Sequence, residues 1–557
     1  MRIIFIIIMF ESIKENIKQA LLINYPDLEI EVNSIQLELL FDEKGDLTTN
    51  ICMKYAKLLS SSPKIIAENI LRNFKHPLVK ETQLAGPGFI NFFFNDDGFE
   101  DLLRFQNPLN AHSKSINIEF VSANPTGPLH LAHGRGAVVG DVLSNLYEFN
   151  GFKVDREYYV NNTGNQINEF LSSILYSISE THSLSLSYQQ YYKGDYIKEI
   201  ANSCYEEFKD IINSNISKDQ KNEIVNFAIG NLVNKSLEVL RSSNINFNSV
   251  IYETDIMKKD HFSKALSALK DKQLVYDGKL QQPKDYKKTK KENNISIFKS
   301  SNFGDDEDRA LTKNDGTPTY FANDIAYHLD KVDRGFDKLI NIWGADHLGY
   351  LTRLKSALKS VKDDIDFEVV FCQIVNLKRD NIIQKLSKRE GTILELDSLI
   401  NEIGTDNFRY FMCYRKNDTH MDLDIDLIKK ENKENPIYYI QYASARTFSV
   451  LKKKKQILDK SLIWSSELKI LYKKIFQWND VVVQASNRNE VHLIAHYLES
   501  LASCFHSYWS ASKGRPELRF LDDNQNISSH HEYLLKRFQS TLNNGLNILG
   551  IKSKTEM

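Results

Sequence analysis

The stretch NPTGPLHLAHGRG, residues 124 to 136, decides most of what can be inferred about the fold. It follows the apolar segment INIEF at 116–120 and leads into a run whose apolar residues recur at helical spacing: Val139, Val142, Leu143 and Leu146. Asn150 and Gly151 then end the helical pattern. The stretch therefore predicts a junction between a strand and a helix.

Such a junction in a parallel α/β unit can bind phosphate, because the first helical N–H groups lack partners and the helix dipole favours an anion. Pro125 and Pro128 stiffen the loop, and glycines allow a ligand to approach the backbone closely. His130 and His133 can point at the same oxygens. These residue types predict a polyphosphate site.

Two other interpretations of the stretch are weaker. Gly134, Gly136 and Gly140 resemble a dinucleotide fingerprint, but their spacing is one residue too long and no suitably placed acid follows a second strand. Two histidines three residues apart could bind a metal ion, but they would need a third ligand, and no HExxH pattern accompanies them.

A second motif lies about 250 residues further on, where Lys385 and Lys388 bracket a short loop in QKLSKREGTILEL. A pair of lysines usually marks a solvated surface. Together with HLAH at a strand-to-helix turn, however, KLSK resembles the second half of the ATP site of class I aminoacyl-tRNA synthetases, whose paired signatures are written HIGH and KMSK. Here Ala132 replaces a glycine and Leu386 replaces a methionine, and both are small changes of shape.

Two acids close to these motifs suit a cationic substrate, since a planar guanidinium pairs bidentately with a carboxylate and needs further acceptors. Glu119 lies in the strand before the HLAH turn, and Asp324 lies in YFANDIAYHLDKVDRGFD at 320–337. Either residue alone would more often be an ordinary surface or capping acid.

Longer segments resemble bacterial-type arginyl-tRNA synthetases over essentially the whole chain and in the same order. The segments are IEFVSANPTGPLHLAHGRG, YVNNTGNQI, YFANDIAYHLDKVDRGFD, IWGADHLGY, CQIVNLKRD and NPIYYIQYASAR. The resemblance implies a ligase that activates L-arginine with ATP and transfers it to the 3′-terminal ribose of tRNA(Arg). It also implies that relatives need bound tRNA before they activate arginine.

The resemblance carries specific roles onto this chain. Glu119, Tyr320 and Asp324 are expected around the arginine guanidinium, and Asn124 at the α-carboxylate end. His130, His133, Lys385 and Lys388 are expected to act on the triphosphate and the departing pyrophosphate of ATP, which carries Mg²⁺. The further ATP contacts are Gly134, Gly344, Asp346, His347, Gln373 and Val375. Some relatives have a lysine where this chain has Gly127, so Lys388 is expected to carry the catalytic charge.

The expected architecture has three parts. Residues 1–105 are expected to form an additional α+β domain that binds tRNA, with a helix presenting Phe10, Ile13, Ile17 and Leu21 and a strand in GPGFINFFFND. Residues 106–410 are expected to form a Rossmann-like parallel-sheet catalytic domain with a polar insertion at about 180–300. Residues 411–557 are expected to form an all-α anticodon-binding bundle.

Three features of these domains leave alternatives open. The lysines of KDYKKTKKENN, at 284–294, could contact phosphates or be a solvated loop. Strict alternation in MDLDIDL predicts one strand with Asp422, Asp424 and Asp426 on an exposed face, rather than a metal site. The resemblance aligns Tyr439, Tyr442 and Met557 with nucleotide-contacting positions, although the tyrosines could also be core residues.

The composition is consistent with this interpretation. A formal charge of −2 neither supports nor excludes RNA, and the five single cysteines indicate a reduced, cytoplasmic protein without structural zinc. The apolar MRIIFIIIMF is too short to span a bilayer, and it predicts a buried strand or a start at Met9. We expect a monomer. The alternatives are a synthetase for another amino acid and a non-catalytic RNA-binding paralogue.

Overall fold

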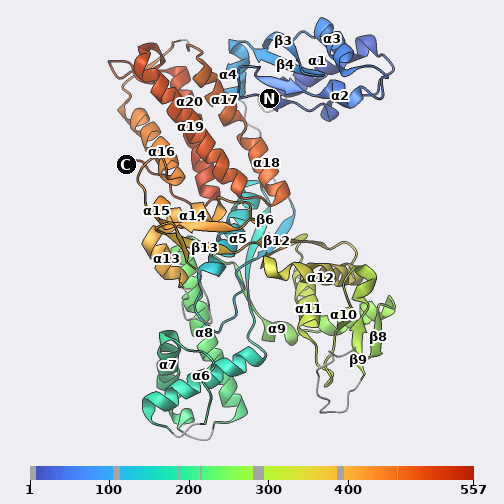
Figure 1. The fold of residues 1–557 in the computed structure, drawn as a ribbon, viewed down its shortest axis with the longest axis vertical. Helices are drawn as coiled ribbons and strands as arrows, with labels where there is room; N and C mark the ends of the chain where they lie inside the picture. The colour runs from blue at the N-terminus through green and yellow to red at the C-terminus, as the bar shows by residue number, and fades with distance from the viewer. Residues whose placement is uncertain are drawn as a thin grey trace.

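The computed structural model describes residues 8–104, 113–184, 187–213, 216–279, 294–384, 394–460 and 462–557. Figure 1 shows a long molecule in which the chain's N-terminal domain lies beside a helical bundle at one end. A parallel sheet lies in the middle, and two separate lobes extend from it at the other end. The segment before residue 8, for which a strand was expected, lies outside the described residues.

The N-terminal domain packs three helices and an antiparallel sheet of order β1-β2-β4-β3. Its elements are α1 (Ile8–Asn24), η1 (Val32–Ser34), β1 (Glu38–Leu39), β2 (Leu47–Thr49), α2 (Ile51–Tyr55), α3 (Pro63–Asn73), β3 (Val79–Ala85) and β4 (Phe89–Phe94), followed by α4 (Asp96–Arg104). The predicted apolar face of α1 is confirmed, since Ile13, Ile17 and Leu21 are fully buried. The predicted α+β class of this domain is confirmed as well.

The central domain, which the sequence predicts to be the catalytic domain, is built on five parallel strands in the order β12-β11-β5-β6-β7. They are β5 (Ser115–Glu119), β6 (Lys153–Val160), β7 (Ser249–Tyr252), β11 (Lys338–Gly344) and β12 (Asp366–Cys372). Helix α5 (Leu131–Phe149) follows β5, so the predicted strand-to-helix junction is confirmed. A Cβ at Gly140 would lie 2.2 Å from Phe120, which shows how closely the helix crosses the end of its strand.

The region expected as one polar insertion forms two excursions, because β7 returns to the sheet between them. The first holds α6 (Asn165–His182), α7 (Asp195–Ile212) and α8 (Lys218–Ser242). The second holds α9 (Glu253–Met257), α10 (His261–Asp271), β8 (Val275–Gly278), β9 (Ile295–Phe298), η2 (Ser300–Phe303), β10 (Arg309–Ala310) and α11 (Tyr320–Asp333). Most of KDYKKTKKENN lies outside the described residues.

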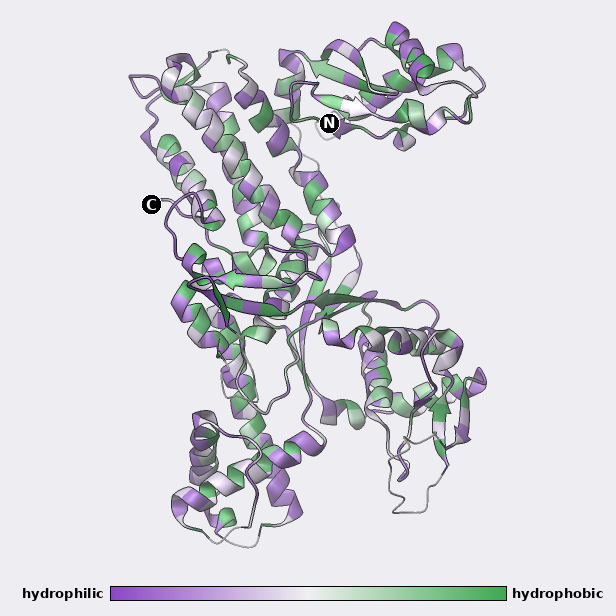
Figure 2. Ribbon diagram, in the orientation of Figure 1, coloured by the Kyte–Doolittle hydropathy of each residue, from purple (hydrophilic) through white to green (hydrophobic). Residues whose placement is uncertain are grey.

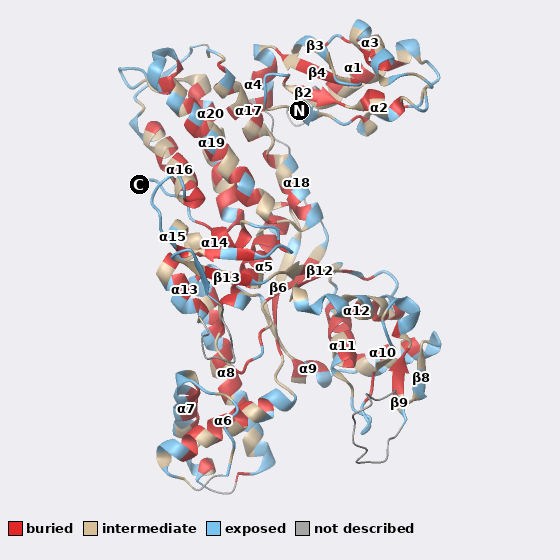
Figure 3. Cartoon of the chain, in the orientation of Figure 1, coloured by how far each residue is buried: buried red, intermediate tan, exposed pale blue. Residues whose placement is uncertain are grey.

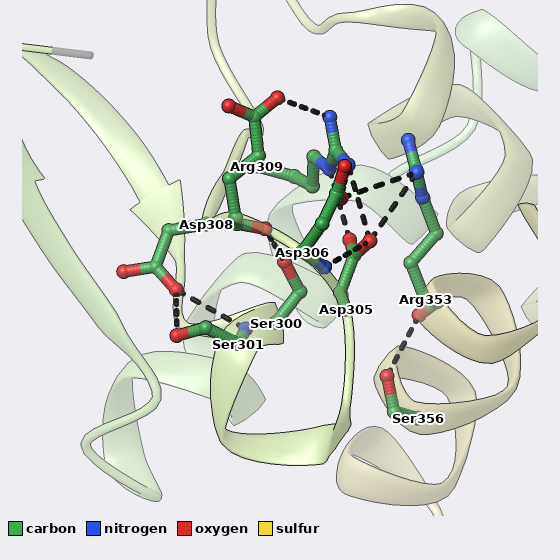
Figure 4. Close-up of polar contacts among 9 residues, drawn as sticks. Ser300, Ser301, Asp305, Asp306, Asp308, Arg309, Arg353 and Ser356 are labelled. Carbon is green, nitrogen blue, oxygen red and sulfur yellow. Dashed lines mark hydrogen bonds and ion pairs between the residues drawn. The ribbon is translucent and has the colours of Figure 1, made fainter. Parts of the chain in front are cut away.

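A charged cluster fastens the second excursion to the catalytic domain (Figure 4). Arg309 Nε donates to Asp305 at 2.9 Å, and Arg353 Nη2 lies 3.3 Å from the same carboxylate. Arg353 belongs to α12 (Leu348–Val361), which follows β11 through η3 (Ala345–His347). The two guanidinium groups hold the pKa of Asp305 far below its usual value, although burial of the side chain opposes them. The cluster therefore fixes the loop at 305–309 against α12.

A small three-stranded sheet follows, in the order β14-β13-β15. It contains β13 (Val375–Arg379), β14 (Ile382–Gln384) and β15 (Met421–Asp424), with α13 (Leu396–Ile403) and α14 (Thr405–Cys413) between the last two strands. The prediction of one strand through MDLDIDL is wrong, because α15 (Ile425–Ile428) begins directly after Asp424. Asp424 caps this helix by accepting the N–H of Leu427, and local side-chain bonding overrides the alternating pattern.

The last part of the chain is the predicted helical bundle. It comprises α16 (Pro436–Lys453), α17 (Ser466–Phe476), α18 (Trp478–Arg488), α19 (His492–Gly514) and α20 (Ser529–Ile548), with the short elements β16 (Ile457–Leu458), η5 (Pro516–Leu518) and β17 (Ile527–Ser528). Apolar residues line the facing sides of these helices (Figure 2), and the same sides are buried (Figure 3). In the described part of the chain, no helix is long and apolar enough to cross a membrane.

The bundle also carries the N-terminal domain. Lys473 of α17 is buried and lies 3.0 Å from Asp46, and Phe10 stacks on Phe476 with ring centroids 5.1 Å apart. Phe99 of α4 packs on Trp464 at 5.2 Å. A paired buried charge and two aromatic contacts hold the domain in a defined position.

A fully buried arginine, Arg409 of α14, joins the catalytic domain to the C-terminal segment. Its guanidinium pairs with Asp141 of α5 and donates to the carbonyl oxygens of Leu549 at 2.6 Å and Ser243 at 2.9 Å. A Cβ at Gly550, where φ is +67°, would lie 2.2 Å from this guanidinium. Only glycine fits there.

Replacing Arg409 with methionine is expected to lower the thermal midpoint, because it removes the donor for these carbonyls and the closer of the two cations that pair with Asp141, leaving Arg156 at 3.5 Å. Breaking a buried pair by removing one partner costs about 3–5 kcal/mol. Thermal melting checks this, with the exposed Arg519→Met change as the control. A midpoint equal to that of the control would contradict the role of Arg409.

Candidate active site

The HLAH turn lies at the N-terminus of α5. His130 is the N-cap residue, with extended backbone angles, and its N–H donates to His133 Nδ1 at 3.2 Å. The two imidazole rings are 3.9 Å apart. Both histidines are partly exposed, and they lie at the positive end of the helix dipole, which favours an anion. Ala132, the departure from the usual signature, is exposed beside them.

The second signature itself, Lys385 to Lys388, lies outside the described residues. The segment that follows it is described, and it pairs with the HLAH turn. Leu131 donates to the carbonyl of Leu394 at 3.2 Å, and Leu396 donates to the carbonyl of Leu129 at 2.9 Å. His130 and Glu395 form an antiparallel bridge. The HLAH turn is therefore joined by backbone hydrogen bonds to the segment 394–396, which follows the second signature in the sequence.

Gly134 has a packing role in the structure. A Cβ at this position would lie 3.0 Å from Leu396 and 3.2 Å from Phe408, both of which belong to the helices that follow the second signature. The absence of a side chain lets α5 approach these helices. This contact supports the same joining of α5 to the part of the chain that begins at residue 394.

The residues predicted to bind the substrate arginine lie around the carboxyl ends of the parallel strands, where open α/β sheets bind ligands. Glu119 ends β5 and is buried, and its carboxylate accepts Lys331 Nζ at 2.7 Å and Ser122 Oγ at 3.0 Å. Asn124, on the loop after β5, is exposed and donates to Gln166 at 3.0 Å. The structure thus gives Glu119 a buried internal cation, which the sequence did not indicate.

Asp324 lies in the second turn of α11 and accepts a hydrogen bond from the Tyr350 hydroxyl. Burial raises the pKa of Asp324 to about 7; the Tyr350 bond opposes this shift, and the charges of Glu119 and Glu253 add to it. Burial raises the pKa of Tyr159, on β6, and the negative charges of the same three acids, Glu253, Asp324 and Glu119, raise it further. Glu119 and Asp324 therefore belong to one electrostatic site.

Tyr320, one turn before Asp324, is 57% exposed. Its hydroxyl would lie only 2.3 Å from a Cβ at Gly164, whose φ is +88°. Glycine is required at 164 both by the backbone angle and by the tyrosine. The turn that follows β6 is thereby placed against the start of α11.

The residues expected at the ATP ribose and adenine come from two neighbouring segments. Gly344 ends β11, and Asp346 and His347 follow it with exposed side chains. Gln373 offers its carbonyl to Arg135 at 3.1 Å, and Val375 is buried at the start of β13. Ile374, between them, is 63% exposed.

The expected anticodon residues lie at the bundle. Tyr439 and Tyr442 are partly buried on α16, and both rings lie against His506, with ring centroids 4.2 and 5.5 Å from it. The Arg446 guanidinium lies 4.0 Å above the Tyr442 ring and donates to its hydroxyl. Met557 is 46% exposed at the chain end. Partial burial is compatible with either packing or base contact.

Comparison with known proteins identifies the three parts of the chain. Residues 11–94 match the arginyl tRNA synthetase N terminal domain, residues 101–421 the catalytic domain of tRNA synthetases class I (R), and residues 440–557 the DALR anticodon binding domain. An arginine–tRNA ligase of Listeria monocytogenes serotype 4b (strain CLIP80459) is 35% identical over 99% of this chain and 98% of its own. One from Bacillus subtilis (strain 168) is 36% identical over 99% of both chains.

A solved structure shows the same fold. The arginyl-tRNA synthetase of Thermus thermophilus superposes with a TM-score of 0.72 over 99% of this chain and all of its own, at 18% sequence identity. The catalytic sheet, its excursions and the helical bundle thus occur together in a second protein.

Proposed function

Since this chain belongs to the arginyl-tRNA synthetase family and ligates L-arginine to tRNA(Arg) with the consumption of ATP, we propose that Glu119, Asn124, Tyr320 and Asp324 bind the arginine. The observation that carries this proposal is the shared field of Glu119 and Asp324 at the carboxyl edge of the sheet. Glu119 is compensated by Lys331, whereas Asp324 has only the neutral Tyr350 hydroxyl as its bonded partner among the described residues.

Charge and shape explain the choice of amino acid. The guanidinium brings the positive charge that Asp324 lacks, and its five N–H groups match several acceptors at once. The Tyr320 hydroxyl supplies one acceptor, and Asn124 contacts the α-carboxylate end. Lysine has no planar fork, so it leaves acceptors unpaired, and such sites reject the incomplete analogue strongly.

The activation step needs stabilisation of charge rather than a protein nucleophile. The arginine carboxylate attacks the α-phosphate of ATP, which binds as its magnesium complex, and pyrophosphate leaves. His130 and His133 bind the triphosphate, and Lys385 and Lys388 stabilise the departing pyrophosphate. Gly134, Gly344, Asp346 and His347 contact the nucleotide, and adenine packs by Gln373 and Val375. The terminal ribose of tRNA then attacks the activated carbonyl.

The remaining contacts belong to tRNA. Residues 1–105 and 411–557 bind it, residues 106–410 are the catalytic unit, and Tyr439, Tyr442 and Met557 contact the anticodon. Stacking of an unpaired base on an aromatic ring contributes about 1–3 kcal/mol. The enzyme acts as a cytoplasmic monomer without structural zinc.

The pocket predicts a pH dependence of arginine binding. The free carboxyl of Asp324 titrates at about 7, and a bound guanidinium favours its ionised form. Arginine must therefore displace a proton below this pH, and the KM for arginine should rise about tenfold for each unit of pH below 7 and be level above it. Steady-state aminoacylation at saturating ATP measures this.

The KM for ATP serves as the internal control, because Asp324 does not contact the nucleotide. The range to measure is pH 5.5 to 8, roughly one to two units either side of the pKa. A KM for arginine that stays constant over this range would show that Asp324 does not contact arginine.

A further inference from the structure

Another buried carboxylate, Glu253, lies at the same edge of the sheet and belongs to no segment that the sequence singled out. Strands β6 and β7 end in register at Val160 and Tyr252, so the residues that follow them, Asn161 and Glu253, emerge side by side. Glu253 begins α9 and is 2% exposed. Burying a charged side chain is costly unless it is hydrogen-bonded, so its partners indicate its purpose.

All the bonded partners that the described residues offer to Glu253 are neutral donors. Thr163 Oγ1 donates at 2.6 Å and Asn323 Nδ2 at 3.0 Å, and the Asn161 amide, turned with its nitrogen toward Glu253, donates at 2.7 Å. The next residue, Thr254, exchanges two hydrogen bonds with Asn162. The first two residues of α9 thus hold the whole 161–163 segment.

These partners are direct neighbours of the arginine contacts. Asn323 precedes Asp324 on α11, and Thr163 precedes Gly164, which the Tyr320 hydroxyl approaches closely. One carboxylate therefore fastens the turn after β6 to the first turns of α11, the two segments that form one side of the pocket. Because its partners carry no charge, it also adds a negative charge behind Asp324.

We propose that Glu253 is a positioning residue of the arginine pocket: it holds the 161–164 turn and the start of α11 together, and its charge strengthens the attraction of the pocket for a cation. This inference rests on the assignment of arginine to Glu119, Tyr320 and Asp324. Glu253 need not touch the substrate, since it acts through Asn323 and Thr163.

The charges around Asp324 define the effect to be measured. Tyr350 faces it from α12, Glu119 from β5, Lys331 from α11 and Glu253 from α9. Of these, Glu253 and Glu119 raise its pKa and Lys331 lowers it. Removing the charge of Glu253 should therefore lower the pKa of Asp324 and move the acid rise in the KM for arginine to lower pH.

The test compares Glu253→Gln and Glu253→Asp with Asp255→Asn, a matched change two residues along the same helix at an acid whose side chain is 59% exposed. Glu253→Gln should raise the KM for arginine about tenfold, as expected for disturbing one or two hydrogen bonds to a charged group, and should leave the KM for ATP unchanged. It should also move the acid rise to lower pH. Glu253→Asp keeps the charge but shortens the reach, so it should raise the KM without moving the pH profile.

Two results would overturn the proposal. One is a KM for arginine in Glu253→Gln that equals that of Asp255→Asn. The other is an equal rise in the KM for arginine and for ATP with an unmoved pH profile, which indicates a loss of general stability. Should Glu253→Gln fail to fold, Glu253→Asp is the test: the proposal requires a higher KM for arginine, an unchanged KM for ATP and an unmoved pH profile. Failure of the pocket assignment itself is distinguished by the wild-type enzyme, whose KM for arginine would then not depend on pH.

Discussion

Asp324→Asn is expected to raise the KM for arginine roughly 100-fold, because removing one member of a desolvated charge pair costs about 2–5 kcal/mol. Asparagine keeps the shape and can still accept the Tyr350 hydroxyl, so the loss isolates the charge. The KM for ATP should stay within about twofold of the wild-type value, since Asp324 does not contact the nucleotide in the proposed site. Steady-state aminoacylation with each substrate varied in turn measures both constants.

The matched control is Asp333→Asn at the end of the same helix, whose side chain is 57% exposed. It removes the same charge and should leave the KM for arginine unchanged. An unaltered KM for arginine in Asp324→Asn would show that this carboxylate does not belong to the arginine pocket. Equal increases in both variants would instead point to the net charge of α11.

Lys388→Ala is expected to slow adenylate formation by about 10²- to 10³-fold, the usual cost of losing one preorganised group that stabilises transition-state charge. The affinity for tRNA should not change, because this loop acts on the pyrophosphate. Pyrophosphate exchange measures the first quantity and equilibrium binding of tRNA the second. The exposed Lys362→Ala is the control. Equal losses in exchange and in tRNA affinity would contradict the assigned role.

A double variant tests whether the two signatures form one site. The backbone of Leu129 and Leu131 pairs with the segment 394–396, which follows the second motif in the sequence. If the side chains act on the same phosphates, Lys388→Ala and His133→Ala should be strongly non-additive, because residues that act as a unit lose most of their effect with the first removal. Additive losses of the rate of adenylate formation would show that the two motifs act independently.

The elements around the HLAH turn could be predicted from the sequence because their signals are local. The apolar spacing through Leu146, the Asn150–Gly151 stop and the prolines of the turn give the strand, the loop and the helix as observed. The apolar face of α1 was predictable for the same reason, since three of its four residues are fully buried.

The features that the sequence missed depend on distant partners. Lys331 is seven residues from Asp324, but only the fold places its ammonium on Glu119, 212 residues away. Glu253 meets Thr163 and Asn323 only because β6 and β7 end in register. In MDLDIDL the alternating pattern predicted one strand, whereas the capping of α15 by Asp424 ended it.

The division of the insertion could not be read from composition either. Strand β7 is four partly buried residues, SVIY, within a long helical and polar region. Such a short run carries little periodicity, and its pairing with β6 is what makes it the edge of the catalytic sheet.

The most direct test of the central claim is ATP–pyrophosphate exchange by the wild-type enzyme with total tRNA present, comparing arginine with lysine and with citrulline, a neutral analogue of nearly the same shape. The account predicts exchange with arginine alone, because Asp324 requires the charge and the other acceptors require the planar fork. Exchange with citrulline at a rate comparable to that with arginine would contradict the charge-based pocket, and exchange with lysine would contradict the role of the fork.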